Sequence, residues 1–393
     1  MTSYNKYKQL FLRNLYKKEF CITIICIGII VKLVLFPFKL GDYNVYLEPW
    51  INFIKNHGYE KSLKFNFYNY APSYIYLLIT IAKIGLNPLY SIKIVSILFE
   101  YILAFYIGKI ANLKYNNNIY IWISLAILPI VPTVLLNGAF WGQCDSIYST
   151  FVIASIYYIL RKKLFLSMLF LGIAFAFKIQ SSFILPFYFV LLLRGNIKWY
   201  VFLIIPIVYF ISIIPAWFYG RTLIELFTIY LSQSDYFKML TVYFPNIYVW
   251  INDDYYELVK ALGTFLTVIL TMSLGLYLSN KRFHFTFDSW IKLAFLSSII
   301  VPFILPGMHE RYLYLGDVIA VLYIFILKKN IHLAVGILFI SFYSYLCCSR
   351  FKDILPLWPA FFLYSTIIIL LVKDFLKTLK ENKYLDTEHS VQS

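Results

Sequence analysis

Four short clusters of polar residues interrupt an otherwise apolar sequence, and their residue types are suited to acid–base chemistry and phosphate binding. Together they supply carboxylates, amides, cations and one imidazole, at the ends of long apolar runs. A carboxylate can act as a general base, and Lys, Arg and His can hold a phosphate and stabilise its charge. The clusters are Gly41-Asp42-Tyr43 with Glu48 and Trp50, Trp141-Gly142-Gln143-Cys144-Asp145-Ser146, Phe177-Lys178-Ile179-Gln180, and Met308-His309-Glu310-Arg311-Tyr312.

The composition places these clusters in a membrane protein. The chain has 393 residues, of which 61% are hydrophobic and 14% charged, and its mean hydropathy is +0.73. Soluble domains are about half apolar and about a quarter charged, so a soluble enzyme and a disordered chain are both excluded. We therefore expect an all-α, polytopic membrane protein.

The net charge and the cysteines are also consistent with a membrane protein. A net charge of +16 would suggest nucleic-acid binding in a soluble protein, but here it fits the excess of Lys and Arg on the cytoplasmic side of membrane proteins, so we expect no nucleic-acid partner. The five cysteines form no CxxC pair and are interpreted as packing residues. The basic N-terminus and the apolar run after it lack a small-residue cleavage site, which indicates an uncleaved first span.

Apolar runs of about the length of a membrane span, some of them shorter, recur along the chain. One of them, 71–86, is short, contains Lys83 and opens with Ala71-Pro72, so we place it at the membrane interface or in a re-entrant segment. The others give twelve spans with both termini in the cytoplasm. The runs are 20–36, 71–86, 89–108, 119–136, 145–160, 164–178, 181–193, 199–218, 258–278, 288–305, 312–327, 331–346 and 355–372.

Loop charge supports this topology, because the basic turns at 161–163, 281–282 and 328–329 then face the cytoplasm. Two long connections, 37–88 and 219–257, lie on the outer side, together with all four polar clusters. Both connections are rich in aromatic residues, so we expect them to be ordered. We also expect the outer turns to be accessible, for example at Asn137 and Gly307.

Each cluster also has an ordinary structural explanation. Asp42 could end a helix at the lipid headgroups, and Asp145 could cap the helix that follows it. Lys178 could extend its ammonium to the headgroups, and the fourth cluster could be a polar turn. These explanations treat each cluster alone. They do not explain why the inner turns lack comparable mixtures of acid and base.

Familiar catalytic motifs are missing from the sequence, which has no HExxH, P-loop, GxSxG or dinucleotide-binding pattern. The residues present fit group transfer from a lipid-anchored phosphate. One carboxylate would take the proton of an acceptor hydroxyl, and the cations would hold the phosphate as it leaves. A phosphate is a good leaving group, so a separate general acid is not required.

The same residues, in order, resemble the GT-C membrane glycosyltransferases, over most of residues 20–330. The likeness is closest to bacterial relatives of the mannosyl- and glucosyltransferases that use dolichyl-phosphate or polyprenyl-phosphate sugars. It is carried by Gly41-Asp42 with Trp50, Tyr68-Asn69-Tyr70-Ala71-Pro72-Ser73, Trp141-Gly142-Gln143-Cys144-Asp145-Ser146, Phe177-Lys178-Ile179-Gln180 and His309-Glu310-Arg311-Tyr312.

The resemblance implies an inverting transfer of one sugar from a polyprenyl-phosphate donor to a glycan or glycolipid acceptor on the outer membrane face. It makes Asp42 the catalytic base, and Tyr70-Ala71-Pro72 the start of a juxtamembrane helix. The residues that would bind the donor phosphate are Lys178, His309 and Arg311, and those that would bind substrate are Tyr70, Trp141, Gln143, Asp145, Gln180 and Glu310.

Domain organisation and partners follow from this interpretation. Residues 1–210 would form the catalytic transmembrane module, and 211–393 a variable half that contributes the His-Glu-Arg turn. We expect a monomer in the plasma membrane with its active site on the extracytoplasmic side. No cofactor is expected, although Asp42, Asp145 and Glu310 could meet at a divalent metal.

Three alternatives stay open. The chain could be a transporter or flippase of lipid-linked saccharides, although no internal repeat is evident and the polar clusters lie at one face. The charges within the apolar runs are also few, namely Lys32, Lys93, Glu100, Lys260, Lys292 and Asp317. It could also be a non-catalytic assembly subunit. Finally, the 219–257 connection, with Asp235, Asp253, Asp254 and many aromatic residues, could bind acceptor sugar by stacking or could be an interfacial aromatic belt.

Overall fold

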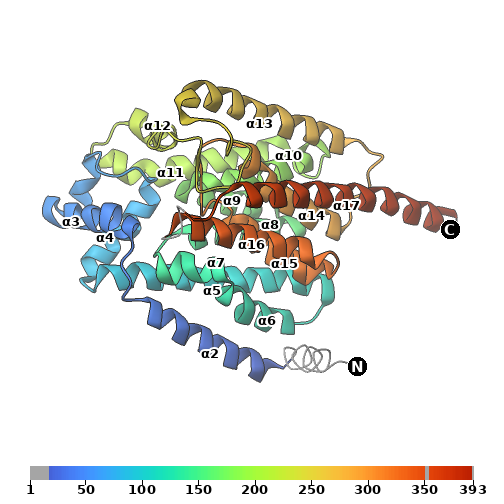
Figure 1. The fold of residues 1–393 in the computed structure, drawn as a ribbon, viewed down its shortest axis with the longest axis horizontal. Helices are drawn as coiled ribbons and strands as arrows, with labels where there is room; N and C mark the ends of the chain where they lie inside the picture. The colour runs from blue at the N-terminus through green and yellow to red at the C-terminus, as the bar shows by residue number, and fades with distance from the viewer. Residues whose placement is uncertain (1–16, 350–353, 392–393) are drawn as a thin grey trace. The chain divides into compact units, whose positions relative to one another are not determined.

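The computed structural model describes residues 17–349 and 354–391, and it is helical almost throughout (Figure 1). Among these residues the only strands are β1 (Thr241–Val242) and β2 (Met308–His309), which pair in parallel. The prediction of an all-α fold is confirmed. The basic residues Lys6, Lys8 and Arg13 of the N-terminus lie outside the described residues.

The chain divides into two compact units that interleave along the sequence. Unit 1 comprises the residues up to Lys178 together with Ile205–Tyr230, and unit 2 comprises Ile179–Ile204 together with the residues from Leu231 onward. The functional division at residue 210 rests on motif content, and it stays a prediction.

Unit 1 holds the helices of the first half of the chain and a later pair. They are α2 (Lys18–Leu35), η1 (Tyr43–Leu47), α3 (Glu48–His57), η2 (Tyr59–Lys64), α4 (Pro72–Ile84), α5 (Pro88–Tyr115), α6 (Ile119–Ile127), η3 (Leu128–Ile130), α7 (Pro132–Leu135), η4 (Leu136–Phe140), α8 (Asp145–Leu160), α9 (Leu164–Phe177), nearly all of α11 (Ile204–Phe218) and most of α12 (Leu223–Ser234).

Unit 2 holds the remaining helices. They are η5 (Ile179–Ile184), α10 (Leu185–Leu193), η6 (Trp199–Leu203), η7 (Asp253–Tyr255), α13 (Tyr256–Ser279), α14 (Phe287–Ile304), α15 (Tyr314–Leu327), α16 (Ile331–Cys348) and α17 (Trp358–Val391). Within it, α14 packs against α15 and α17, and α16 packs against α15 and α17.

Local sequence signals explain where the helices begin and end. The α5 helix starts with Pro88 in its first turn, and the side chain of Asn87 accepts a hydrogen bond from the Tyr90 amide at 3.4 Å. The α4 helix likewise starts at Pro72, as the Tyr70-Ala71-Pro72 pattern predicts, and it ends at Gly85, whose φ of 76° favours glycine.

The apolar run 119–136, which we predict as one span, is instead bent. Its two parts, Ile119–Ile130 and Pro132–Phe140, meet at an angle of 63°. Val131 between them has extended backbone angles, because the ring of Pro132 excludes the helical conformation from the preceding residue. The run is therefore a broken span or a re-entrant segment, and its second part leads into the second polar cluster.

Within the described parts of the chain, six helical segments are long and apolar enough to cross a membrane, or seven if the bent pair counts as one span. Five further apolar helices are shorter, α4 and α8 among them. The chain is accordingly an all-α protein with several candidate membrane spans. The six segments are Pro88–Tyr115, Trp199–Phe218, Asp253–Ser279, Phe287–Ile304, Ile331–Cys348 and Trp358–Glu381.

The first long connection is folded and packed, as we expect from its aromatic content. In α3 one face is buried, including Trp50 and Ile54, and this face contributes to the apolar core of unit 1. The hydroxyl of Tyr76 on α4 donates to the carbonyl of Ser212 at 2.9 Å and accepts from the amide of Ala216 at 3.1 Å. The connection that carries Asp42 is thus held against the helices of unit 1.

Candidate functional site

Asp42 lies at the beginning of a helical segment, residues 41–57, that follows the first apolar helix. Since α2 already ends at Leu35, Asp42 does not end it. Its half-buried side chain accepts a hydrogen bond from the side-chain amide of Gln143, with 2.5 Å between Nε2 and Oδ2. Two polar clusters that are 101 residues apart in sequence therefore meet here.

The residues after Asp42 anchor its helical segment in the core. Tyr43 and Leu47 are buried, while Glu48 forms an exposed ion pair with Lys39 at 3.1 Å. Burial, together with the charge of Glu48, raises the pKa of the Tyr43 phenol to about 12, so this hydroxyl stays protonated at neutral pH. Asp42 is thus presented by a segment whose apolar face is fixed.

A tight turn presents Gln143. The backbone amide of Trp141 donates to the carbonyl of Leu136 at 2.8 Å, and that of Gln143 donates to the carbonyl of Asn137 at 2.9 Å. Gly142 between them has a φ of +69°, a conformation that favours glycine. The backbone of this turn directs the Gln143 amide, which is 5% exposed, at Asp42.

Asp145, Lys178 and Asn137 form a buried polar group in the same unit. Asp145 is the first residue of α8, and Lys178 follows the end of α9. Their side chains form an ion pair and are each 2% exposed, and the other carboxylate oxygen of Asp145 accepts from Asn137 Nδ2 at 2.8 Å. A buried charge pair of this kind is costly to assemble and more costly to break.

Aromatic rings surround the ammonium of Lys178. It lies 5.7 Å from the ring centroid of Tyr70 and 5.9 Å from that of Tyr148, both within cation–π range. Tyr70 in turn packs edge-on against Trp50, with 5.6 Å between the ring centroids. The first connection therefore reaches the Asp145–Lys178 pair through Tyr70, against which Trp50 packs.

The structure contradicts one alternative and one expectation that the sequence suggested for these residues. Lys178 is buried in unit 1, so its ammonium does not extend to lipid headgroups. Asn137 has no exposed surface, because it is folded into the π-helical turn η4 and binds Asp145. A reagent in solution would reach Asn137 only if this part of the fold opened.

The fourth cluster lies in unit 2. Arg311 Nη1 donates to Glu310 Oε1 at 2.7 Å, and His309 Nδ1 is 3.9 Å from the other carboxylate oxygen. The imidazole also packs between two rings, with centroid distances of 5.1 Å to Phe237 and 5.1 Å to Tyr312. Glu310 is almost completely buried, and its carboxylate lies between the Arg311 guanidinium and the His309 imidazole.

Gln180, which we place with the substrate-binding residues, is in η5 and therefore in unit 2. It is 3% exposed, and its Oε1 has no hydrogen-bond partner among the described residues. The amide could accept a hydrogen bond from a ligand hydroxyl.

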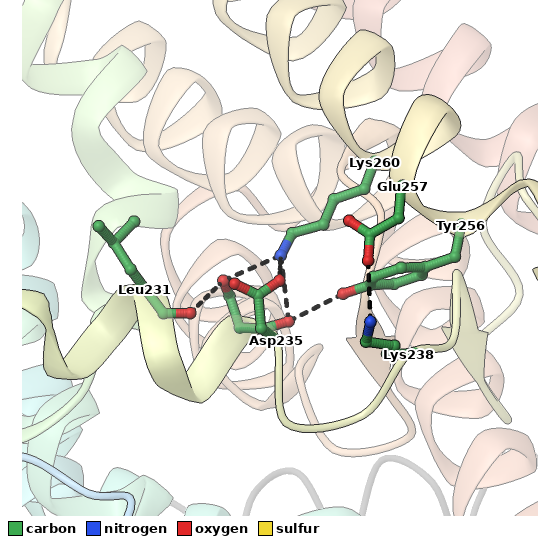
Figure 2. Close-up of polar contacts among 7 residues, drawn as sticks. Leu231, Asp235, Lys238, Tyr256, Glu257 and Lys260 are labelled. Atoms are coloured by element: carbon green, nitrogen blue, oxygen red, sulfur yellow. Dashed lines mark hydrogen bonds and ion pairs between the residues drawn. The ribbon is translucent and has the colours of Figure 1, made fainter.

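Polar contacts join the second long connection to α13 (Figure 2). Lys260 on α13 pairs with Asp235 and donates to Ser234 Oγ at 3.2 Å, and Tyr256 Oη donates to the Ser234 carbonyl at 3.0 Å. Lys238 pairs with Glu257 at 3.1 Å. These contacts fix residues 234–238, and with them the ring of Phe237 that covers His309.

The other carboxylates of this connection also bind the connection itself. Asp253 Oδ1 accepts from the Leu240 amide at 2.7 Å, and Asp254 Oδ2 accepts from Asn252 Nδ2 at 2.6 Å. These contacts give both residues a structural explanation. Whether the aromatic rings of the connection bind sugar stays a prediction.

Taken by unit, the candidate residues fall into two groups. In unit 1, Asp42 meets Gln143, and Tyr70 meets the Asp145–Lys178 pair, with Trp141 in the turn just before Gln143. In unit 2, His309, Glu310 and Arg311 form one cluster. That the two groups face one substrate is a prediction that these contacts do not test.

Sequence reasoning missed several residues of the site. Tyr148 and Ser96 fall inside runs interpreted only as spans, and Ser96 Oγ donates to the Gln143 carbonyl at 2.6 Å. Asn137 directly follows the run 119–136 and is expected only as part of an accessible outer turn. Among residues 17–349 and 354–391, no group of three or more His, Cys, Asp or Glu side chains is placed to hold a metal ion.

Comparison with known proteins adds no further assignment. No protein-family model matches this chain, and no curated protein matches it. The functional interpretation therefore depends on the residues and contacts described above.

Proposed function

We propose that this protein is a GT-C-type membrane glycosyltransferase that moves one sugar from a polyprenyl-phosphate donor to a hydroxyl of a lipid-linked or cell-envelope glycan acceptor. The observation that carries the proposal is the contact between Asp42 and Gln143, in the same unit as the buried Asp145–Lys178 pair. A half-buried carboxylate oriented by an amide has the position that a general base needs.

In the proposed reaction the acceptor oxygen attacks the anomeric carbon of the donor sugar from the side opposite the phosphate. The bond between that carbon and the phosphate oxygen breaks, and its electron pair leaves with the polyprenyl phosphate. Asp42 accepts the proton of the acceptor hydroxyl as the new glycosidic bond forms. Attack from the opposite side inverts the configuration at the anomeric carbon.

Lys178, His309 and Arg311 are the proposed ligands of the donor phosphate. Both Lys178 and Arg311 are paired with a carboxylate, Asp145 and Glu310 respectively. An ammonium has three N–H donors and a guanidinium has five, so each can bind a carboxylate and a phosphate together. We infer that these carboxylates hold the cations in place while the phosphate binds.

The proposed topology has twelve spans in the plasma membrane, with α4 at the outer interface and the site on the extracytoplasmic side. Loop charge supports it, because this topology puts the basic turns at 161–163, 281–282 and 328–329 on the cytoplasmic side. At 13 residues, α4 is about 20 Å long, shorter than the roughly 30 Å hydrocarbon core.

The test is reconstitution of the purified protein with a polyprenyl-phosphate sugar and a panel of glycolipid acceptors. We expect Asp42→Asn to abolish transfer while donor binding, measured by calorimetry, is kept. Glu60→Gln is the matched control, because it also neutralises one carboxylate of the first connection but its exposed pair with Lys83 is worth little. Normal turnover by Asp42→Asn would refute the assignment of the base.

The second candidate is a transporter or flippase of lipid-linked saccharides. It is favoured by ionisable groups buried between helices, namely the Lys32–Glu100 pair and Asp317, which accepts from Ser341 Oγ at 2.6 Å. Movement of labelled saccharide lipid across a vesicle membrane without any glycosidic product would favour this function over transfer.

A further inference from the structure

One face of α5 carries three polar residues, Lys93, Ser96 and Glu100, at spacings of three and four. All three are buried, with exposed fractions of 2% or less. None of them belongs to the polar clusters that suggested the function, yet each binds a segment that leads to Asp42 or to Gln143. The contacts of this face connect the segment that leads to Asp42 with the turn that carries Gln143.

Lys93 binds the chain between α2 and Asp42. Its ammonium donates to the carbonyls of Leu35 and Phe36 at 3.0 Å each and to that of Phe38 at 2.8 Å. Carbonyls at a helix C-terminus lack partners within the helix, and a cation is a favourable one. All three N–H donors of the ammonium are used, so the backbone four to seven residues before Asp42 is tied to α5.

The same face of α5 binds the turn that carries Gln143. Ser96 Oγ donates to the backbone carbonyl of Gln143 at 2.6 Å, and Ser146 Oγ donates to the Ser96 carbonyl at 2.9 Å. The stem of Lys93 passes close to Gly142, where an added Cβ would lie 3.6 Å from Lys93 Cγ. Lys93 therefore touches both segments.

One turn further along α5, Glu100 binds α2. It forms a buried ion pair with Lys32 on α2, and its Oε1 would lie only 1.9 Å from a Cβ added at Gly138. The α5 helix thus binds the first apolar helix through Glu100 and the turn at 136–143 through Ser96.

We propose that Lys93 and Ser96 are positioning residues that set the alignment of Asp42 with Gln143; this inference rests on the proposed function. Lys93 fixes the backbone before the base, and Ser96 fixes the backbone of the residue that orients it. Proton abstraction needs the base within hydrogen-bond reach of the acceptor hydroxyl, and a misplacement of about 1 Å can cost roughly 100-fold in rate. Neither side chain touches the reacting atoms.

The decisive experiment compares Lys93→Met with Lys83→Met in the reconstituted transfer assay. Both variants remove one ammonium from an otherwise similar side chain, but Lys83 is exposed on α4, where it pairs with Glu60 and lies over the ring of Tyr59. We expect Lys93→Met to lower kcat roughly 100-fold with the donor KM within about two-fold of the wild type. Lys83→Met should leave both constants unchanged.

Ser96→Ala tests the other half of the alignment and removes only one hydroxyl. We expect a smaller fall in kcat, about five-fold, again at constant donor KM, because one hydrogen bond to the Gln143 carbonyl is lost. If Lys93→Met does not accumulate as folded protein, Ser96→Ala decides the question. Unchanged kcat in Ser96→Ala, or an effect on KM alone, would overturn the proposal.

A second readout does not depend on activity. Cysteines placed at positions 42 and 143, in a chain whose five native cysteines are replaced, are cross-linked with a short bifunctional thiosulfonate. We expect the yield to fall several-fold when Lys93→Met or Ser96→Ala is added, and equal yields would refute positioning. If the double-cysteine chain cross-links as expected but the unaltered chain, with Asp42 and Gln143 in place, transfers no sugar, the proposed function alone is refuted.

Discussion

Replacing Lys178 by methionine should destabilise the protein strongly, because it leaves the carboxylate of Asp145 buried without its cation. Both side chains are 2% exposed, so water screens the pair poorly. Asn137 would keep its hydrogen bond to the carboxylate, but an amide cannot neutralise the charge. Breaking a buried pair on one side costs about 3–5 kcal/mol.

The double variant Lys178→Met/Asp145→Leu should be more stable than Lys178→Met, because both charges are then removed and the volume is filled with apolar atoms. Buried pairs replaced in this way are often neutral in stability. The amide of Asn137 loses its acceptor, which costs about 1–3 kcal/mol. The expected order of stability is therefore wild type, double variant, single variant.

The assay is thermal unfolding in detergent, followed by tryptophan fluorescence. At about 2–4 °C per kcal/mol for a unit of about 200 residues, Lys178→Met should lower the Tm by roughly 6–20 °C. Lys238→Met is the control, since its pair with Glu257 is more than 70% exposed on both sides and should shift the Tm little (Figure 2). If the double variant were less stable than Lys178→Met, the buried-charge explanation would be wrong.

Two further predictions concern other contacts of unit 1. Gly138→Ala should cost about 1–3 kcal/mol in unfolding experiments, because the added Cβ would lie 1.9 Å from Glu100 Oε1; an unchanged Tm would contradict this packing. The hydrogen bond from Lys83 lowers the pKa of Glu60 below 4.5, so the pair stabilises the fold at neutral pH and this stabilisation is lost on acidification through the lowered pKa. The small Tm difference between wild type and Lys83→Met should therefore vanish in acid, and a difference that grows there would refute the pairing.

Much of the helical framework could be predicted from the apolar runs, because a membrane-spanning segment must be helical and long. The bend at Val131 could not be predicted from hydropathy, which is insensitive to backbone geometry. Pro129 and Pro132 were visible in the sequence and mark the place where the helix breaks. The helices α3 and α12 within the long connections were expected only as ordered segments.

The candidate site could be predicted as a set of residues but not as a set of contacts. The predicted topology puts Asp42, Gln143 and Lys178 on one side, yet it cannot say which carboxylate Lys178 binds. Asn137 directly follows an apolar run and Lys93 lies inside one, where composition outweighs a single polar residue. Their roles depend on tertiary packing that no local pattern records.

The π-helical stretch η1, directly after Asp42, makes chain length as important as residue identity in this region. A π turn accommodates one more residue than an α-helix does, and such turns are frequent at functional sites. A chain with one residue fewer between Asp42 and Trp50 would either lose the π turn or, if it kept it, rotate Asp42 by about 100° relative to the buried face of Trp50. The count of residues from Asp42 to Trp50 is therefore a constraint that homologous sequences should share, even where the residues between them differ.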